Sequence, residues 1–210
     1  MKVYSQIVCM WLVLFLISSC APVATPADES ATMEPQLTST TDTTEKYHSL
    51  NTRSGIEEVD IVLAAVESGD PQNLRDLFDY STLQCMTVNA LGGPPPCREG
   101  EAEGTLVEVL PTLGPEGSYI YKDEIRNWPG LDVSHLYAIY QVSESAYSDE
   151  NYPKGDYGVI LIGKENSPNI VLQIKDGGIV RMDFLLDVSR SELIATFERQ
   201  ASDVIIAPLE

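Results

Sequence analysis

The stretch YGVILIGKENSPNIVLQIKDGGIVRMDFLL, residues 157–186, decides the fold. Within it, residues 169–174 and 179–186 are rich in β-branched and apolar side chains, and the turn sequence KDGG separates them. Two such runs around an Asp-Gly turn are a strong signal for a β-hairpin. Residues 157–163 form another apolar run of strand length. We therefore expect neighbouring strands of one sheet here.

Strand-like segments also precede this stretch. Residues 105–110 are β-branched and apolar, and residues 118–121 follow a turn that contains glycine and proline. Residues 135–143 carry apolar side chains on both alternating faces, which indicates a central strand. Residues 123–128 are typical of a single helical turn, which ends at Pro129.

Helical periodicity appears before and after the strands. The sequence SGIE at 54–57 has capping-box spacing, and Gly69 ends the apolar face that follows it. Asp70 and Pro71 suit the cap and first turn of a second helix, and SRSE at 189–192 opens a last one. The side chains expected to face the core are Ile56, Val59, Leu63 and Val66, then Leu74, Leu77 and Phe78, and finally Leu193, Ile194 and Phe197.

Helices first and strands afterwards, without β-α-β alternation, indicate the α+β class. We expect short N-terminal helices packed on a curved antiparallel sheet, with a C-terminal helix. Residues 54–210 are long enough for a single domain of this kind.

The amino terminus has the features of a secretory leader. Lys2 gives a positive start, and residues 7–17 are an almost wholly apolar run. A spanning helix needs about 18 residues or more, so this run better matches a signal-peptide core. The run ends in ISSC, residues 17–20, which resembles the lipobox of bacterial lipoprotein precursors. The resemblance implies removal of residues 1–19, acylation of Cys20 with chains such as palmitate, and a location on the cell membrane facing outside the cytoplasm.

Two alternatives stay open for the leader: an uncleaved membrane anchor, and a plain secreted protein that is cut elsewhere. The segment after it, residues 20–53, is rich in Thr, Ser and Pro and poor in apolar side chains. Such a composition buries too little surface to fold, so we expect a disordered tether.

Two cysteines remain for the folded domain. Cys9 leaves with the leader and Cys20 is acylated, which leaves Cys85 and Cys97 within the loop-like residues 81–104. In an exported protein such a pair is most simply a disulfide. The alternatives are a redox pair or a metal site, but a metal needs more ligands than two cysteines.

Two local patterns carry a second resemblance. The sequence SGDP at 68–71 with Leu74 after it, and the hairpin at 171–185 with its DGGI turn, resemble the cone-shaped α+β superfamily of nuclear transport factor two, ketosteroid isomerase and polyketide cyclases. The resemblance implies a curved sheet that wraps a long helix and leaves an apolar pocket at its open end.

Enzymes of that superfamily use a carboxylate, a tyrosine or a His–Asp pair inside the cone. The residues that this resemblance implies are Asp183, His135, Tyr140, Tyr137 and Asp132. A buried aspartate with a raised pKa can act as a base, and a pocket tyrosine can bind an oxyanion. The simpler interpretation makes Arg181 and Asp183 an exposed ion pair and treats the strand tyrosines as packing residues.

Charge and motifs narrow the function further. The formal net charge is -19, and no basic stripe interrupts it, so nucleic-acid binding is disfavoured. The chain has no nucleophile elbow, phosphate-binding loop, dinucleotide fingerprint or His-Glu-x-x-His motif. The oxygen-rich loop at 149–156 fails the calcium-binding register, because Pro153 occupies the third ligand position. We expect no metal and no cofactor.

Three tyrosines, Tyr147, Tyr152 and Tyr157, border the same loop and suit a contact surface or stacking on sugars, or else packing over a hairpin base. We therefore expect a membrane-anchored lipoprotein with a non-catalytic binding or interaction domain. Its partners are the membrane, through the lipid anchor, and a protein, a glycan or a small apolar ligand. The alternative is a small-molecule lyase or isomerase of the cone type that uses a pocket Asp or His.

Overall fold

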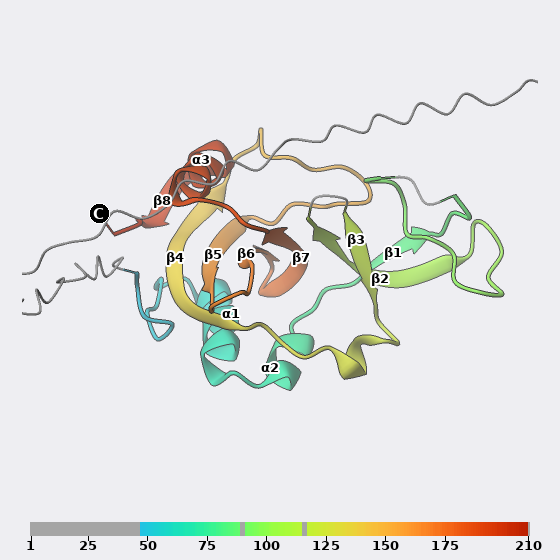
Figure 1. Cartoon of the computed structure of the whole chain (residues 1–210), viewed down its shortest axis with the longest axis horizontal. Helices are drawn as coiled ribbons and strands as arrows, with labels where there is room; N and C mark the ends of the chain where they lie inside the picture. Colours follow the sequence, from blue (N-terminus) through green and yellow to red (C-terminus); the bar gives the residue numbers. More distant parts are fainter. Residues whose placement is uncertain (1–46, 89–90, 115–116, 210) are drawn as a thin grey trace, which may run out of the picture. The chain divides into compact units, whose positions relative to one another are not determined.

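The computed structural model describes residues 47–88, 91–114 and 117–209. Three helices and an eight-stranded sheet make up this part of the chain (Figure 1). The helices are α1 (Glu57–Ser68), α2 (Pro71–Arg75) and α3 (Arg190–Gln200), with a 3-10 turn η1 at Ile125–Asn127. The strands are β1 (Ser81–Gln84), β2 (Leu106–Leu113), β3 (Ser118–Tyr121), β4 (Val133–Val142), β5 (Tyr157–Gly163), β6 (Asn169–Lys175), β7 (Gly178–Leu185) and β8 (Ala201–Ile206).

The predicted α+β class is confirmed, including the C-terminal helix. The sheet order is β1-β2-β7-β6-β5-β4-β8, and β3 pairs with β2 outside this path. The β6–β7 hairpin lies at the centre of the sheet, and its Asp176-Gly177 turn has positive φ at both residues, as a tight hairpin turn requires.

One strand pair departs from the expected antiparallel arrangement. β2 and β7 run parallel, over the two pairs Thr112–Met182 and Leu113–Asp183. The two strands are far apart in the sequence and are not joined by a hairpin, so nothing local fixes their relative direction. This short pair connects the β1-β2-β3 group to the rest of the sheet.

Both faces of the sheet are covered. On one face α1 buries Val59, Val62 and Leu63 against side chains of the central strands, such as Leu136 and Leu172. Figure 1 shows α1 and α2 on this side of the sheet and α3 on the opposite side. Because both faces are buried, the central strands are apolar on both sides, as their sequences predicted.

The second face packs against α3. Leu193 and Phe197 lie over Tyr140, Ile160 and Val171. The neighbouring Ile194, which was expected to face inward, is 38% exposed, because the α3 positions that reach the sheet are Leu193, Thr196 and Phe197.

The start of α1 differs from the prediction. Ile56, not Ser54, is the N-cap residue, and it makes no side-chain capping bond. Asp60 instead accepts hydrogen bonds from the Ser54 backbone N–H at 2.6 Å, the Ser54 hydroxyl at 2.7 Å and the Gly55 N–H at 3.1 Å. Burial opposes ionisation of this carboxyl, but these hydrogen bonds lower the pKa of Asp60 overall. The predicted capping box is therefore replaced by a carboxylate one turn into the helix.

The other two predicted helix starts are confirmed. Asp70 caps α2 by accepting from the Gln72 N–H, and Pro71 occupies the first turn. Ser189 and Glu192 form a complete capping box at the start of α3.

Ordered structure begins earlier than the predicted boundary at residue 54. His48 pairs with Leu136 of β4 through two backbone hydrogen bonds of 2.9 Å, and its Nε2 lies 2.8 Å from the Ala207 carbonyl oxygen. The leader, Cys20 and residues 20–46 of the predicted tether lie outside the described residues. Within residues 47–88, 91–114 and 117–209, no helix has the length and apolarity needed to cross a bilayer.

Candidate functional site

The structure places the residues of the predicted cone-type site at separate positions. Asp183 on β7 and Tyr140 on β4 lie on the sheet face that α3 covers, with Val171 and Gly158 as their cross-strand neighbours. His135 lies at the other end of β4, where it is exposed. Each of the three makes its own contacts.

Asp183 forms a buried, bidentate ion pair with Arg181. Arg181 Nε donates to Asp183 Oδ1 at 2.7 Å and Nη2 donates to Oδ2 at 3.0 Å. Arg181 Nη1 also donates to the carbonyl oxygens of Tyr147, Tyr152 and Pro153, each at 3.1 Å. The pairing predicted from the sequence is present, but the predicted exposure is wrong: Arg181 is 2% and Asp183 6% exposed. The connection between β4 and β5 folds over the pair and excludes solvent.

The electrostatics of this pair are those of a buried carboxylate with one strong partner. Burial raises the pKa of Asp183, and the Arg181 guanidinium and Gln173 lower it, with a net upward shift. Both carboxylate oxygens are occupied by the guanidinium. The pair therefore fixes the connection between β4 and β5 to the sheet.

Tyr140 belongs to a neighbouring network. Its hydroxyl donates to Gln200 Oε1 at 2.6 Å, and Gln173 Nε2 donates to the same oxygen at 3.3 Å. The Tyr140 ring covers Gly158, where a Cβ atom would lie 2.2 Å from the ring. Burial raises the pKa of Tyr140, and Asp183 adds to the rise. This hydroxyl ties the end of α3 to the sheet.

His135 is in neither network. Its Nδ1 lies 2.9 Å from the Ser134 hydroxyl, and its ring centroid is 5.7 Å from that of Tyr47. Asp132, the other acid of the predicted set, accepts from Lys164 and Ser167 at the surface.

The predicted disulfide is confirmed. Cys85 and Cys97 are joined, with their Cα atoms 4.8 Å apart. The bond lies in a small core of its own, separate from the cores under α1 and α3. The other members of this core are Val107, Val109 and Tyr121, with Leu83 and Tyr119 packed against it.

The loop closed by the disulfide is held against β3 by two tyrosines. Tyr119 donates its hydroxyl hydrogen to the Gly93 carbonyl oxygen at 2.6 Å, and Tyr121 donates to the Pro96 carbonyl oxygen. On the other side, the Met86 N–H donates to the Pro95 carbonyl oxygen at 2.9 Å. The prolines have no N–H of their own, so their carbonyl groups make the backbone hydrogen bonds of this segment.

A cavity of about 160 Å³ opens between this loop and β3, and we call it the tyrosine cleft. Its walls are Pro94 and Pro96 of the loop, Ser118 and Tyr119 of β3, and Tyr152. Gly93, Gly117 and Tyr121 complete the lining. Figure 1 shows the long connection between β4 and β5, which carries Tyr152, reaching across to β3.

Two aromatic rings form one side of the tyrosine cleft. The centroids of Tyr119 and Tyr152 are 5.3 Å apart, and their planes are inclined by 31°. Tyr152 is buried and Tyr119 half-buried. A Cβ atom at Gly117, whose φ is +67°, would lie 2.6 Å from the Tyr152 hydroxyl. Glycine is therefore required at position 117, where the backbone passes close to the Tyr152 ring. Burial raises the pKa of Tyr119 and contact with Tyr152 raises it further.

These tyrosines predict a loss of stability at alkaline pH. Burial raises the pKa of Tyr119 and Tyr121 above the ordinary value of 10.0, so their stabilising effect is complete below that pH. As the pH rises above 10, tyrosines in the unfolded chain ionise first and the free energy of unfolding falls. Urea denaturation at increasing pH, with tyrosinate absorbance as the titration signal, measures this. A Tyr119→Phe/Tyr121→Phe variant should show a shallower fall, and an equal slope would contradict the assignment.

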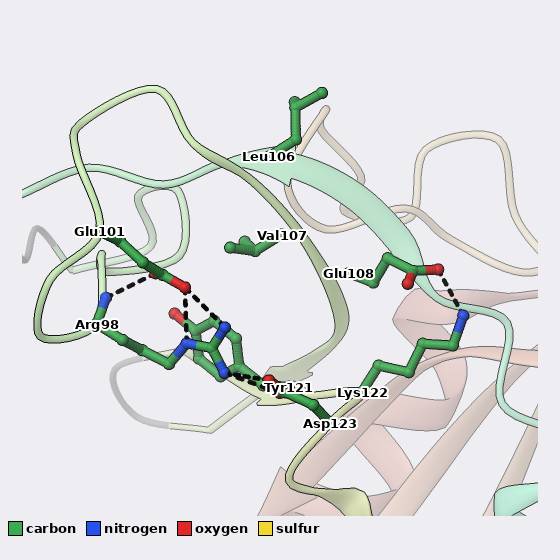
Figure 2. A pocket seen from close by; sticks show the side chains of 8 residues that line it. All are labelled: Arg98, Glu101, Leu106, Val107, Glu108, Tyr121, Lys122 and Asp123. Atoms are coloured by element: carbon green, nitrogen blue, oxygen red, sulfur yellow. Dashed lines mark hydrogen bonds and ion pairs between the residues drawn. The ribbon is translucent and has the colours of Figure 1, made fainter.

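A second hollow, of about 290 Å³, lies on the other side of Tyr121, and we call it the Arg98 pocket. Figure 2 shows the Arg98 guanidinium between Glu101 and Asp123. Nε and Nη2 donate to Glu101 Oε1 at 3.0 and 2.7 Å, and Nη1 donates to the Asp123 carboxylate at 2.8 and 2.7 Å. The guanidinium carbon lies 4.6 Å from the centre of the Tyr121 ring. Lys122 pairs with Glu108 at 2.5 Å at the edge of the pocket.

The charged side chains of the Arg98 pocket are ion-paired, with the two basic groups Arg98 and Lys122 facing three carboxylates. The hydrogen bonds that Arg98 donates to Glu101, and next those that it donates to Asp123, raise the pKa of Arg98, and the same bonds lower the pKa of both carboxyl groups. A guanidinium held on two sides by carboxylates holds the disulfide loop to β3. Because Arg98 follows Cys97 directly, it is a further attachment of that loop, besides the disulfide and the two tyrosine hydroxyls.

The oxygen-rich loop at 149–156 is organised by hydrogen bonds. Asp149 Oδ1 accepts from the N–H groups of Asn151 and Tyr152, each at 2.8 Å. In the described part of the chain, no three His, Cys, Asp or Glu side chains lie close enough together to hold a metal ion. Of the tyrosines that border the loop, Tyr147 is exposed, Tyr157 is half-buried, and Tyr152 lies in the tyrosine cleft.

Sequence reasoning missed the role of Tyr119, Tyr121 and Arg98. The two tyrosines are two residues apart on a strand, which places them on one face, and this is the signal that could have found them. Their contacts with the triproline segment and with Tyr152 join parts of the chain that no local pattern connects.

Comparisons with known proteins found no relative of this chain. No protein-family model, no curated protein and no solved structure matches the chain. The resemblances to lipoprotein precursors and to the cone-shaped superfamily therefore stay predictions from the sequence.

Proposed function

We propose that this protein is a lipid-anchored membrane protein that faces outside the cytoplasm and carries a non-catalytic binding or interaction domain. The lipobox-like sequence at residues 17–20 supports Cys20 as the anchor. The Cys85–Cys97 disulfide supports the location, because disulfides persist in oxidising compartments and are rare in the cytosol.

The contacts of the predicted catalytic side chains favour binding over catalysis. A general acid or base must reach a substrate atom within hydrogen-bond distance. Asp183 is ion-paired with Arg181 on both oxygens, and the Tyr140 hydroxyl is bonded to Gln200. Because these groups hold the fold together, no geometric observation favours the cone-type lyase or isomerase.

The observation that carries the binding proposal is the disulfide-closed loop with its two hollows. The tyrosine cleft and the Arg98 pocket both include Tyr121, so they lie next to each other on one part of the surface. The segment at residues 93–98 is held by the disulfide, by the tyrosine hydroxyls and by Arg98. A binding surface that is already ordered costs less entropy when a partner binds.

Site-directed photo-crosslinking in intact cells tests this proposal. A photoreactive residue replaces Leu91, which is exposed two residues before Gly93 and does not line the tyrosine cleft, in the full-length chain. The matched control carries it at Glu198, which is exposed on α3. We expect a discrete adduct from position 91 and none from position 198. No adduct from position 91, or equal adducts from both, would contradict a binding surface at the disulfide loop.

A further inference from the structure

The tyrosine cleft has the chemistry of a sugar subsite. We propose that it binds one ring of a neutral oligosaccharide, an inference that depends on the proposed binding function and names its ligand class. The charge, aromatic surface, rim groups, rigidity and size of the cleft support this ligand class.

The lining of the cleft is uncharged although the protein is strongly acidic. The chain carries 32 Asp and Glu and has a formal net charge of -19. The residues that line the cleft are glycines, prolines, a serine and tyrosines. A cationic ligand finds no carboxylate there, and an anionic ligand finds no base and is repelled by the surrounding charge. The cleft therefore suits a neutral ligand.

The aromatic side of the cleft offers a stacking surface. Tyr119 is half-buried and lies against the buried Tyr152 ring, with 5.3 Å between centroids. Aromatic side chains combine a large apolar face with a polar tip. A pyranose ring matches this surface because one face of the ring presents C–H groups and its edge carries hydroxyls.

The rim of the cleft supplies hydrogen-bonding groups for those hydroxyls. The Ser118 hydroxyl, which lies 2.6 Å from that of Thr112, is on an exposed residue and can both donate and accept. The Gly93 carbonyl oxygen accepts one bond from Tyr119 and has a second lone pair. A purely apolar ligand leaves the remaining hydrogen-bonding capacity of these two groups unused, and desolvating it without a partner is unfavourable.

The walls are fixed before any ligand binds. The proline wall, Pro94 and Pro96, leads directly into Cys97. The hydroxyl of Tyr121 holds the Pro96 carbonyl oxygen, and that of Tyr119 holds the carbonyl oxygen of the preceding Gly93. The volume of about 160 Å³ is smaller than the roughly 300–1,000 Å³ of sites that enclose a drug-sized ligand. The cleft therefore accepts a single ring, with the rest of the oligosaccharide outside.

Fluorine NMR of the full-length protein in detergent micelles, labelled with 3-fluorotyrosine, tests the inference. Tyr→Phe variants assign the Tyr119 and Tyr152 resonances. The probes are maltotriose, cellotriose and triacetylchitotriose as neutral saccharides, trigalacturonate as a charged one, and decaproline as a peptide. We expect at least one neutral saccharide to shift both resonances saturably, and trigalacturonate and decaproline to leave them unchanged.

Three variants locate the binding. Tyr119→Ala should weaken affinity by about tenfold or more, because the stacking surface is lost. Ser118→Lys keeps both aromatic rings but should abolish binding, because the lysine side chain fills the mouth of the cleft. Tyr147→Ala, at an exposed tyrosine that does not line the cleft, should bind as the unmodified protein does.

The inference is overturned if no neutral saccharide shifts these resonances, if trigalacturonate or decaproline shifts them instead, or if Ser118→Lys leaves saccharide binding intact. An adduct from position 91 in the crosslinking experiment, combined with a negative saccharide titration, contradicts the sugar as the ligand but leaves the proposed binding function standing. Absence of that adduct contradicts the binding function itself.

Discussion

Replacing Arg181 by methionine is expected to lower the free energy of unfolding by about 3–5 kcal/mol, the largest effect of any single substitution discussed. The change leaves the Asp183 carboxylate buried without its partner, and removes the donor that holds the carbonyl groups of Tyr147, Tyr152 and Pro153. Urea denaturation followed by circular dichroism measures the loss.

The matched control is the double variant Arg181→Met/Asp183→Leu. Removing both charges removes the unpaired buried carboxylate, so this variant should recover much of the lost stability. The carbonyl groups of the connection between β4 and β5 still lose their donor, so recovery is incomplete. A loss below about 1 kcal/mol for Arg181→Met would mean that the pair is hydrated and exposed, as the sequence had suggested.

Removing the disulfide has the second-largest expected effect. The bond joins cysteines separated by 12 positions, and closing a loop of this size stabilises a fold by about 3 kcal/mol in the chain-entropy model. The double variant Cys85→Ser/Cys97→Ser should lose about this much free energy of unfolding. It should also broaden the fluorine resonance of Tyr119, because the proline wall beside this ring loses the disulfide bond that restrains it.

Reduction of the unmodified protein provides the control for this substitution. Dithiothreitol should reproduce the loss of stability in the native sequence and have no effect on the double serine variant. If reduction leaves the unfolding midpoint unchanged while alkylation shows both thiols free, the disulfide does not hold the loop.

Much of the fold was predictable because local patterns determine it. The KDGG turn and its flanking β-branched runs predicted the β6–β7 hairpin, and Ser189 with Glu192 predicted the start of α3. β1 and β8 were missed because no local pattern marks either segment as a strand. Ser81–Gln84 is short and mixed in polarity, and Ala201–Ile206 follows α3 directly, so both are strands only because β2 and β4 pair with them.

The environment of Asp183 was not predictable from the alternation of its strand. Arg181 and Asp183 do share a face, but that face is buried under α3 and the connection between β4 and β5. Alternation indicates which residues share a side, and not what covers that side. The network of Tyr140 and Gln200 depends on where α3 packs, which is likewise a long-range contact.

The disulfide of the candidate site was predictable, and the tyrosine cleft was not. Of the four cysteines, Cys9 belongs to the predicted leader and Cys20 is the predicted acylation site, so Cys85 and Cys97 are the pair expected to be joined. The cleft brings together the triproline segment, β3 and Tyr152, which are distant in the sequence. The sequence left Tyr152 open between a contact surface and packing over a hairpin base, and nothing in it singled out Tyr119.

The intact mass of the native protein tests the central claim most directly. The protein is extracted from membranes with detergent, without reductant and with an alkylating agent present. If the protein is exported and lipid-anchored, we expect a chain that begins at Cys20 and carries fatty acyl chains. Its Cys85 and Cys97 should be joined and therefore not alkylated. A chain that retains Met1, a chain without acyl groups, or two alkylated domain cysteines would contradict it.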